Sequence, residues 1–329
     1  MKSVAKAGTV LALAVSAAFW GGCVRSQSFV NDHPYYDESA HSYYNRQGPK
    51  GAGSIAERIE QLGQPKKKVV VFDFWNDTPV QGGDLGSFAA DELRRGLFET
   101  ERVVLPLDIK AQLQTDQFIQ GDKVKVAQLV LEGRKLGVSV VVIGRIAKLV
   151  FRQRGDDVGL LRQTQSLAAA ELEIKVFDVQ AGREIMAIGR SGESSTNALV
   201  AFEKEHLESP EYRAELSKLA IRDALSAGAV DGVVKGIEKM SWEGRIAKLN
   251  GRKIYVNAGK VSGIVSGDIL RVTTPGEDVY DPVTGAFLGT AQGQLKGTLE
   301  VVDFIGEDGA VANVHTGGGF HEGDVVRLY

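Results

Sequence analysis

Two short apolar runs constrain the fold more than any other feature of this sequence. Val69–Phe72 and Val138–Ile143 are almost wholly apolar, which is typical of strands that are buried on both faces. Between them, apolar residues recur at helical spacing twice, once after Asp84, which can cap a helix, and once over Lys123–Leu136. Val103–Leu105 adds a short strand. The sequence therefore predicts a sheet with helices packed on it.

A different pattern follows in Leu167–Asp178. Every second residue from Ala168 to Val176 is apolar, and Glu171, Glu173 and Lys175 stand among the intervening positions. Strict alternation indicates a strand with one face in water. Asp178–Gly182 then predicts a turn, after which Glu184–Arg190 returns as an antiparallel partner. Combined with the buried runs, this hairpin predicts a mixed sheet.

A long helix is predicted from the capping residue Ser209 to about Lys239. Small residues recur in it every four positions and form one stripe. Each internal glycine costs about 1 kcal/mol relative to alanine, so we expect the stripe to pack closely against the sheet or another subunit. A break in the helix at Gly228 is the alternative. The stripe consists of Ala220, Ala224, Gly228, Gly232 and Gly236.

From Trp242 onward the sequence predicts short strands and turns. Asn250-Gly251 and Asp308-Gly309 are strong hairpin signals. The segment that begins at Gly267-Asp268 is echoed at Gly323-Asp324, each time as a turn before a short apolar strand. Repeated use of that unit favours a small barrel. The candidate strands are 245–249, 253–257, 269–273, 298–304 and 310–314.

The N-terminal residues have the pattern of a secretory signal. Lys2 and Lys6 precede an apolar stretch, Ala7–Phe19, that is too short to span a bilayer stably. Cys23, the one cysteine of the chain, follows a pair of glycines, which resembles the lipobox of bacterial lipoproteins. We therefore expect cleavage before Cys23 and acylation of its thiol; ordinary cleavage near Ser16–Ala18 is the alternative.

The predicted fold class is α/β (α+β), with a mixed sheet flanked by helices and then a small all-β, SH3-like barrel. The predicted boundaries are 1–22 for the signal peptide, 23–64 for a lipidated tether, 65–241 for the α/β domain and 242–329 for the barrel domain. The tether shows neither helical nor strand periodicity.

Signals for catalysis and for metal or nucleic-acid binding are poor. The sequence contains neither a nucleophile elbow, nor a zinc-protease motif, nor a Walker lysine. Gly82-Gly83 stands where a phosphate loop would stand, but a plain connection is favoured. His315 and His321 have no further ligands beside them in the sequence, and a formal charge of −3 gives no general attraction for nucleic acid. We expect a non-enzyme without metal or cofactor, apart from the covalent lipid on Cys23.

Several motifs resemble the CsgG family, lipoproteins of curli secretion and related envelope systems. The opening strand ends in Asp73 and Phe74, with Asn76 and Thr78 at alternate positions after them, as in that family. Leu136–Gly144 and Phe177–Arg183 are similar to its later motifs, and the resemblance covers about 66–242. It implies a CsgG-like sheet, related to anticodon-binding folds.

The C-terminal part is similar to another envelope protein family. The residues from Trp242 resemble the C-terminal domain of the flagellar H-ring protein FlgT, notably at Val256–Gly259 and Asp281–Gly285. The two resemblances together imply a lipoprotein on the periplasmic face of the outer membrane. It would be a non-catalytic scaffold that self-associates into a ring and contacts other proteins of a flagellar or secretion machine.

A curli-like secretion channel is the first alternative, and a periplasmic ligand-binding module that uses the Gly82-Gly83 loop is the second. Residues 150–166 carry charge on both faces, and residues 184–200 carry Arg190 and Glu193. A charge on a lipid face costs about 2–4 kcal/mol at mid-depth. We therefore expect both segments to remain in the periplasm as loops or short hairpins.

Overall fold

The computed structural model describes seven stretches of the chain, all within one compact unit, Gln47–Tyr329. The signal peptide, Cys23, the tether up to residue 62 and the Gly82-Gly83 loop lie outside the described residues. The described stretches are residues 63–80, 84–106, 115–121, 123–155, 163–199, 209–285 and 287–329.

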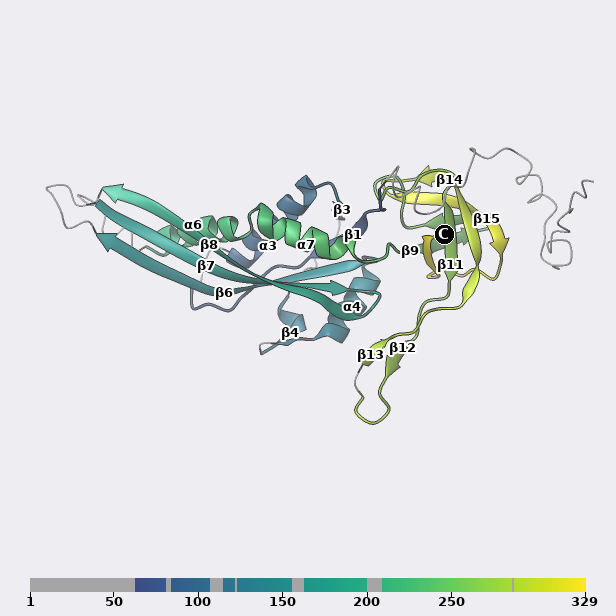
Figure 1. Cartoon of the computed structure of the whole chain (residues 1–329), viewed down its shortest axis with the longest axis horizontal. Coiled ribbons are helices and arrows are strands. Elements are labelled where there is room, and N and C mark those ends of the chain that lie inside the picture. Colours follow the sequence, from purple (N-terminus) through teal and green to yellow (C-terminus); the bar gives the residue numbers. More distant parts are fainter. Residues whose placement is uncertain are drawn as a thin grey trace, which may run out of the picture. The chain divides into compact units, whose positions relative to one another are not determined.

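A mixed sheet forms the first half of this unit and confirms the α+β class (Figure 1). Its strand order is β3-β1-β6-β7-β8, and β2 pairs with β6 beside β1. The pairs β1–β3 and β1–β6 are parallel, whereas β6–β7 and β7–β8 are antiparallel. The strands are β1 (Lys67–Val71), β2 (Trp75–Asn76), β3 (Val103–Val104), β6 (Val140–Gly155), β7 (Gln163–Asp178) and β8 (Arg183–Leu199).

Three of these strands are much longer than the sequence predicted. β6 and β7 have 16 residues each and β8 has 17, so the expectation of loops or short hairpins over 150–166 and 184–200 was wrong within the described residues. The antiparallel register continues without a break from Leu149↔Ala170 to Gly155↔Thr164. Charged residues do not end these strands, because an antiparallel sheet can keep one face in water.

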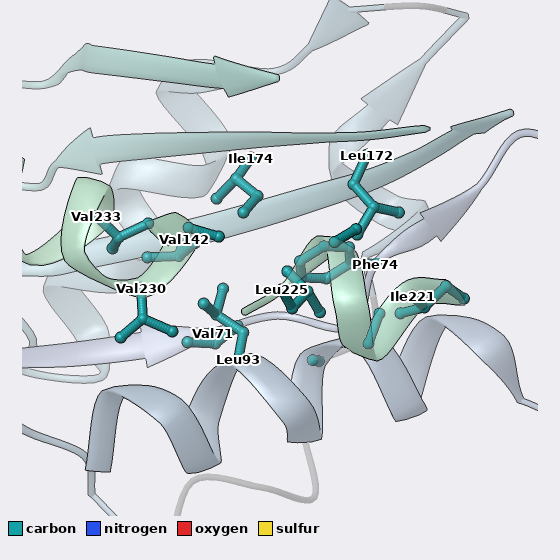
Figure 2. Packing of buried hydrophobic residues seen from close by; sticks show 14 of the residues in the cluster. Val71, Phe74, Leu93, Val142, Leu172, Ile174, Ile221, Leu225, Val230 and Val233 are labelled. Atoms are coloured by element: carbon teal, nitrogen blue, oxygen red, sulfur yellow. The ribbon is translucent and has the colours of Figure 1, made fainter. Parts of the chain in front are cut away.

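Helices lie on both faces of the sheet, as Figure 1 shows. α3 (Leu85–Glu99), α6 (Pro210–Ala224) and α7 (Ala227–Glu238) pack on one face, and α4 (Val126–Lys135) packs on the other. The main core lies under the first three helices and contains Val71, Leu93, Val142, Ile174 and Val233 (Figure 2). The smaller core lies under α4 and contains Phe72 and Phe177.

Three helix boundaries differ from the sequence prediction. The expected helix 209–239 is divided into two helices. Leu225, which is buried, departs from helical geometry, and Ser226 is extended, with φ −55° and ψ 176°. α4 begins at Val126 rather than Lys123, since β5 (Lys123–Val124) pairs with β4 (Ile119–Gln120) after the short 3-10 helix η2 (Asp116–Phe118).

The two predicted helix caps also differ from one another. The Ser209 hydroxyl accepts a hydrogen bond from the Tyr212 amide at 3.2 Å, as a capping serine should. The Asp84 side chain makes no such bond; its backbone has a φ of 45°, and its carbonyl accepts from the Ser87 hydroxyl. The start of α3 is therefore fixed by backbone contacts rather than by the predicted carboxylate.

A closed six-stranded barrel follows, which confirms the small all-β unit. Asn250-Gly251 forms the turn between its first two strands, where Gly251 has a φ of 60°. The two Gly-Asp repeats precede strands that pair with each other, and the buried Asp268 and Asp324 each accept a backbone N–H three residues away. The strands are β9 (Gly244–Asn250), β10 (Lys253–Val256), β11 (Ile269–Thr273), β14 (Leu295–Ile305), β15 (Gly309–Gly317) and β16 (Val325–Leu328).

A two-stranded arm projects from the barrel between β11 and β14 (Figure 1). It consists of β12 (Asp278–Tyr280) and β13 (Phe287–Thr290). The predicted turn at Asp281–Gly285 forms its tip, where the Asp281 carboxylate accepts the amides of Val283 and Thr284. Those hydrogen bonds hold the pKa of Asp281 below its ordinary value.

Candidate functional site

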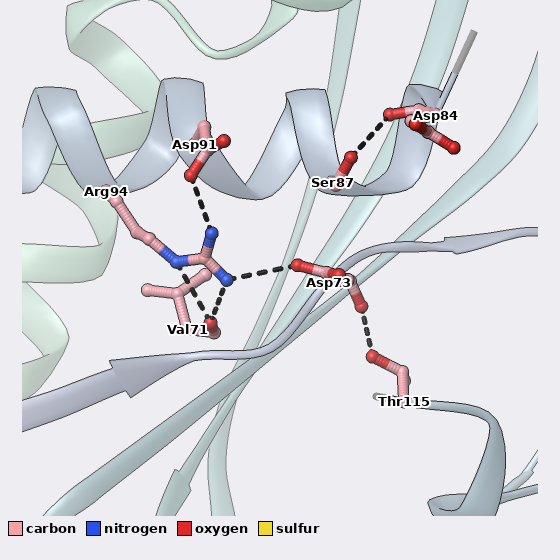
Figure 3. A network of polar contacts seen from close by, with 7 residues as sticks. All are labelled: Val71, Asp73, Asp84, Ser87, Asp91, Arg94 and Thr115. Carbon is pink, nitrogen blue, oxygen red and sulfur yellow. Dashed lines mark hydrogen bonds and ion pairs between the residues drawn. The ribbon is translucent and has the colours of Figure 1, made fainter. Parts of the chain in front are cut away.

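The family-like motif after β1 lies at a polar junction between the sheet and α3 (Figure 3). Arg94 of α3 donates to the Val71 carbonyl at 2.6 Å and to the Asp73 carboxylate at 3.1 Å, while Asp91 accepts from its other nitrogen at 2.7 Å. The Asp73 carbonyl accepts from the Thr115 hydroxyl. Asp73 therefore joins β1 to α3 and to the segment before η2.

The remaining motif residues close the loop that follows β1. The Asn76 carboxamide accepts from the Thr78 amide and hydroxyl at 3.1 and 2.7 Å, and donates to the Val80 carbonyl at 2.9 Å. Phe74 is buried in the main core, with its ring against Gly144. These contacts position strands and a helix, and none of them forms a pocket for a ligand.

The small-residue stripe meets β8 at several points. Ala220 and Ala224 lie against Gly192, where an added β-carbon would stand 2.2 Å from the Ala224 amide nitrogen. Gly232 and Gly236 lie over Ile188 and Met186 of β8. A β-carbon on Gly232 would lie 3.1 Å from the nearest atom of Ile188, and one on Gly236 would lie 2.1 Å from the nearest atom of Met186. Gly228 differs, because it is exposed and has no atom within 4 Å of that position.

Beyond α4, the sheet face opposite α6 carries ion pairs rather than further helices in the described residues. Lys148 pairs with Glu171 across β6 and β7 at 3.2 Å, and both side chains are more than half exposed. Arg145 pairs with Asp77 and lies over the Trp75 ring. Exposed pairs of this kind stabilise a protein little, so this face is best understood as a solvated surface.

Two strand edges of the long sheet lack a partner among the described residues. β8 pairs with β7 on one side and with no described strand on the other, and β6 has no second partner beyond Ile146, where β2 ends. The Glu193 amide of β8 donates to the Asp223 carboxylate at 3.0 Å, which shows that its N–H points away from β7. Because backbone direction alternates along a strand, Ser191 and Ser195 also direct their N–H groups outward.

His315 of β15 and His321, in the loop after it, contact different partners. His315 Nδ1 lies 3.0 Å from the Thr298 hydroxyl, and His321 Nδ1 lies 2.9 Å from the Lys296 ammonium, which is paired with Asp324. No group of three potential metal-binding side chains occurs in the part of the chain that the structure describes. None of the described helices has the length and apolar character needed to span a membrane.

A cluster of charges where the α/β part faces the barrel was missed by sequence reasoning. Arg134 of α4 binds Asp278 of the arm with two hydrogen bonds, at 2.9 and 3.0 Å. Arg327 donates to Glu243 at 2.6 Å; burial raises the pKa of Glu243, while Arg327 opposes that rise. Hydrogen bonding to Arg134 lowers the pKa of Asp278. These partners are distant in sequence and carry no local motif that could have revealed them.

No protein-family model matches the sequence, and no curated protein is significantly similar to it. Among solved structures, a hypothetical protein from Chlamydia trachomatis is 14% identical and aligns over 53% of this chain and 98% of its own, with a TM-score of 0.34. Lipoprotein GNA1162 from Neisseria meningitidis is 13% identical over 51% and 99%, with a TM-score of 0.27. The PelC dodecamer from Paraburkholderia phytofirmans is 12% identical over 50% and 88%, with a TM-score of 0.26. Likenesses this weak assign no function, and the resemblances to CsgG and FlgT stay predictions.

Proposed function

We propose that this protein is a non-catalytic lipoprotein of the periplasmic face of the outer membrane, and that it is a scaffold which associates with itself. The observation that carries the proposal is the three-stranded extension β6–β7–β8, whose two outer edges pair with no other strand among the described residues. An open edge presents a row of backbone donors and acceptors that can pair with another strand.

The positions of the two edges determine which assembly they favour. The edge of β8 and the distal edge of β6 lie on opposite sides of the same sheet. A contact between unlike edges of neighbouring copies is head-to-tail, and such contacts give rings when the rotation closes. A ring held on the membrane by its lipid anchors would present the barrel and its arm to other proteins of a secretion or flagellar machine.

A curli-like secretion channel is the second candidate, and strand length is the observation that favours it. A membrane-spanning strand needs about 9–11 residues, and β6, β7 and β8 exceed that length. Lys148, Arg152 and Glu171 are all exposed on the described part of the sheet. These charges share one face of the sheet, and α6 packs on the other face against Ala168 and Ala170 of β7. Neither face is thus an apolar surface free to contact lipid, and the scaffold is favoured over the channel.

The lipid anchor is tested by replacing Cys23 with serine in the exporting bacterium. We expect the wild-type protein in the outer-membrane fraction, with a mass that shows acylation, because two or three acyl chains anchor a protein stably. The Cys23→Ser variant should appear in the soluble periplasm. An unmodified thiol in the wild-type protein would contradict the anchor.

A further inference from the structure

A cavity of about 240 Å³ lies between one end of the mixed sheet, the barrel and the base of the arm. Ser139 and Gln180 line it from the end of the sheet. Glu243 lines it from just before β9, Arg245 from the start of β9, and Gly293 from the base of the arm. The space is wide enough to hold several water molecules. That volume suits a small ligand rather than a cofactor or a folded partner.

The arm side of the cavity is closely packed. A β-carbon on Gly293 would lie 1.7 Å from the Thr274 carbonyl oxygen, and one on Gly276 would lie 2.2 Å from that of Ala291. The Thr274 amide also donates to the Gln294 carbonyl at 2.9 Å. With no room for side chains at the two glycines, the two chain segments at the base of the arm are held close together.

Most charges at the cavity already have partners. Arg327 binds Glu243, and Arg134, just behind the lining, binds Asp278. Asp178 accepts the amides of Gln180 and Ala181 at 2.8 and 2.9 Å. Of the two carboxylates that line the cavity, Glu243 is thus paired with a cation, and Asp178 is held by the backbone of its own turn.

Arg245 is the exception. Its backbone N–H donates to Asn257, but its guanidinium makes one long hydrogen bond, 3.3 Å from Nη1 to the Arg134 carbonyl. No carboxylate oxygen of the described residues lies within ion-pair distance of it. Burial lowers the pKa of Arg245, and the charge of Arg134 lowers it further, whereas the charge of Glu243 raises it. A partly buried cation without a counter-ion is costly, and an external anion would remove that cost.

We propose that this cavity binds a small anion, a carboxylate or a phosphate, through the Arg245 guanidinium. The planar guanidinium can donate two parallel hydrogen bonds to either group. The site is separate from the strand edges, so the proposal does not depend on self-association.

The test is calorimetric titration of the intact purified protein with inorganic phosphate and, separately, with acetate, at matched ionic strength in chloride. We expect saturable binding of at least one of the two anions at one site. Arg245→Gln should weaken that binding at least tenfold, since charge-assisted hydrogen bonds are the strong ones. Arg252→Gln, in the exposed turn after β9, is the matched control and should bind as the wild type does.

A second measurement separates ligand binding from a structural role. Without added anion, Arg245→Gln should melt at or above the wild-type temperature, because it removes an uncompensated charge. Saturating anion should then stabilise the wild type and not the variant. The proposal is overturned if neither anion binds saturably, if Arg245→Gln binds as tightly as the wild type, or if the variant melts well below the wild type without anion.

Discussion

Gly192 of β8 lies directly beneath Ala224 of α6, so closely that a β-carbon on Gly192 would be 2.2 Å from the Ala224 amide nitrogen. The same atom would lie 2.4 Å from the Ala220 carbonyl oxygen. Backbone therefore meets backbone at this point, and neither element can shift without moving the other. This contact holds α6 beside the edge strand of the long sheet and brings Asp223 to the Glu193 amide.

The first prediction concerns that contact. Gly192→Ala should destabilise the protein by about 1–3 kcal/mol, because overpacking forces the helix away from the strand. Gly189→Ala is the matched control: it lies in the same strand, and nothing lies within 4 Å of its added β-carbon. Thermal unfolding followed by circular dichroism should show a lower Tm for Gly192→Ala than for Gly189→Ala. Equal melting temperatures would mean that α6 does not rest on β8 as described.

The second prediction concerns the stripe along α7. Gly232→Leu should lower the Tm, since the added side chain meets Ile188 and Arg190 of β8. Gly228→Leu, one turn earlier, points into open space and should leave the Tm unchanged or raise it, because leucine favours helix over glycine. If the Gly232 variant were as stable as the Gly228 variant, the stripe would face solvent along its whole length.

The third prediction concerns pH. Asp308 accepts hydrogen bonds from the Gly259 and Ser262 amides and pairs with Lys68 of β1. Burial alone would raise the pKa of Asp308, but these hydrogen bonds and the Lys68 charge outweigh it and hold the pKa below its ordinary value. A carboxyl group whose pKa is lowered by folding stabilises the protein at pH values above its pKa in the unfolded chain, about 3.9. That stabilisation is lost as the pH falls through the lower pKa of the folded state.

Asp308→Asn should therefore lower the Tm near neutral pH by about 2–4 °C, for a loss of about 1 kcal/mol. The difference from the wild type should shrink as the pH falls through about 4 and below. Thermal melts over that range measure it. A difference that stays constant with pH would show that the Asp308 charge contributes nothing.

The fourth prediction concerns the channel alternative. The purified oligomer should give no conductance steps in planar bilayers, because charged residues occupy the exposed face of β6 and β7. Cysteines introduced at the exposed positions Arg152 and Glu193 should react with aqueous labelling reagents in cells whose outer membrane has been permeabilised. Reproducible conductance steps, or protection of both labels by lipid, would favour the secretion channel.

The sequence predicted the elements whose signal is local. The run at Val69–Phe72 and the alternation from Ala168 to Val176 identify buried and half-buried strands, because burial on one or two faces imposes those patterns. The strand extensions were missed, since Arg152 and Gln153 resemble a loop unless the antiparallel partner beside them is known. Register is a property of two segments, and no single segment reveals it.

The position of the helix break, which the alternative reading put at Gly228, and the charge cluster were missed for related reasons. The four-residue stripe continues from Ala224 to Gly228 across the break, so periodicity gave no sign that Leu225 turns into the core. Arg245 and Arg134 come together only because the barrel folds back near α4. Sequence spacing contains no record of such a contact.

The central claim, self-association through the β8 edge, is tested most directly by the mass of the detergent-purified protein from light scattering after size exclusion. The N–H groups of Ser191 and Ser195 point outward, so Ser191→Pro combined with Ser195→Pro removes two edge donors without removing a hydrogen bond to β7. Ser191→Ala with Ser195→Ala keeps both N–H groups and is the control. We predict an oligomer for the wild type and the alanine control, and a monomer with an unchanged circular dichroism spectrum for the proline variant. A monomeric wild-type protein, or a folded proline variant that still forms the oligomer, would contradict the account.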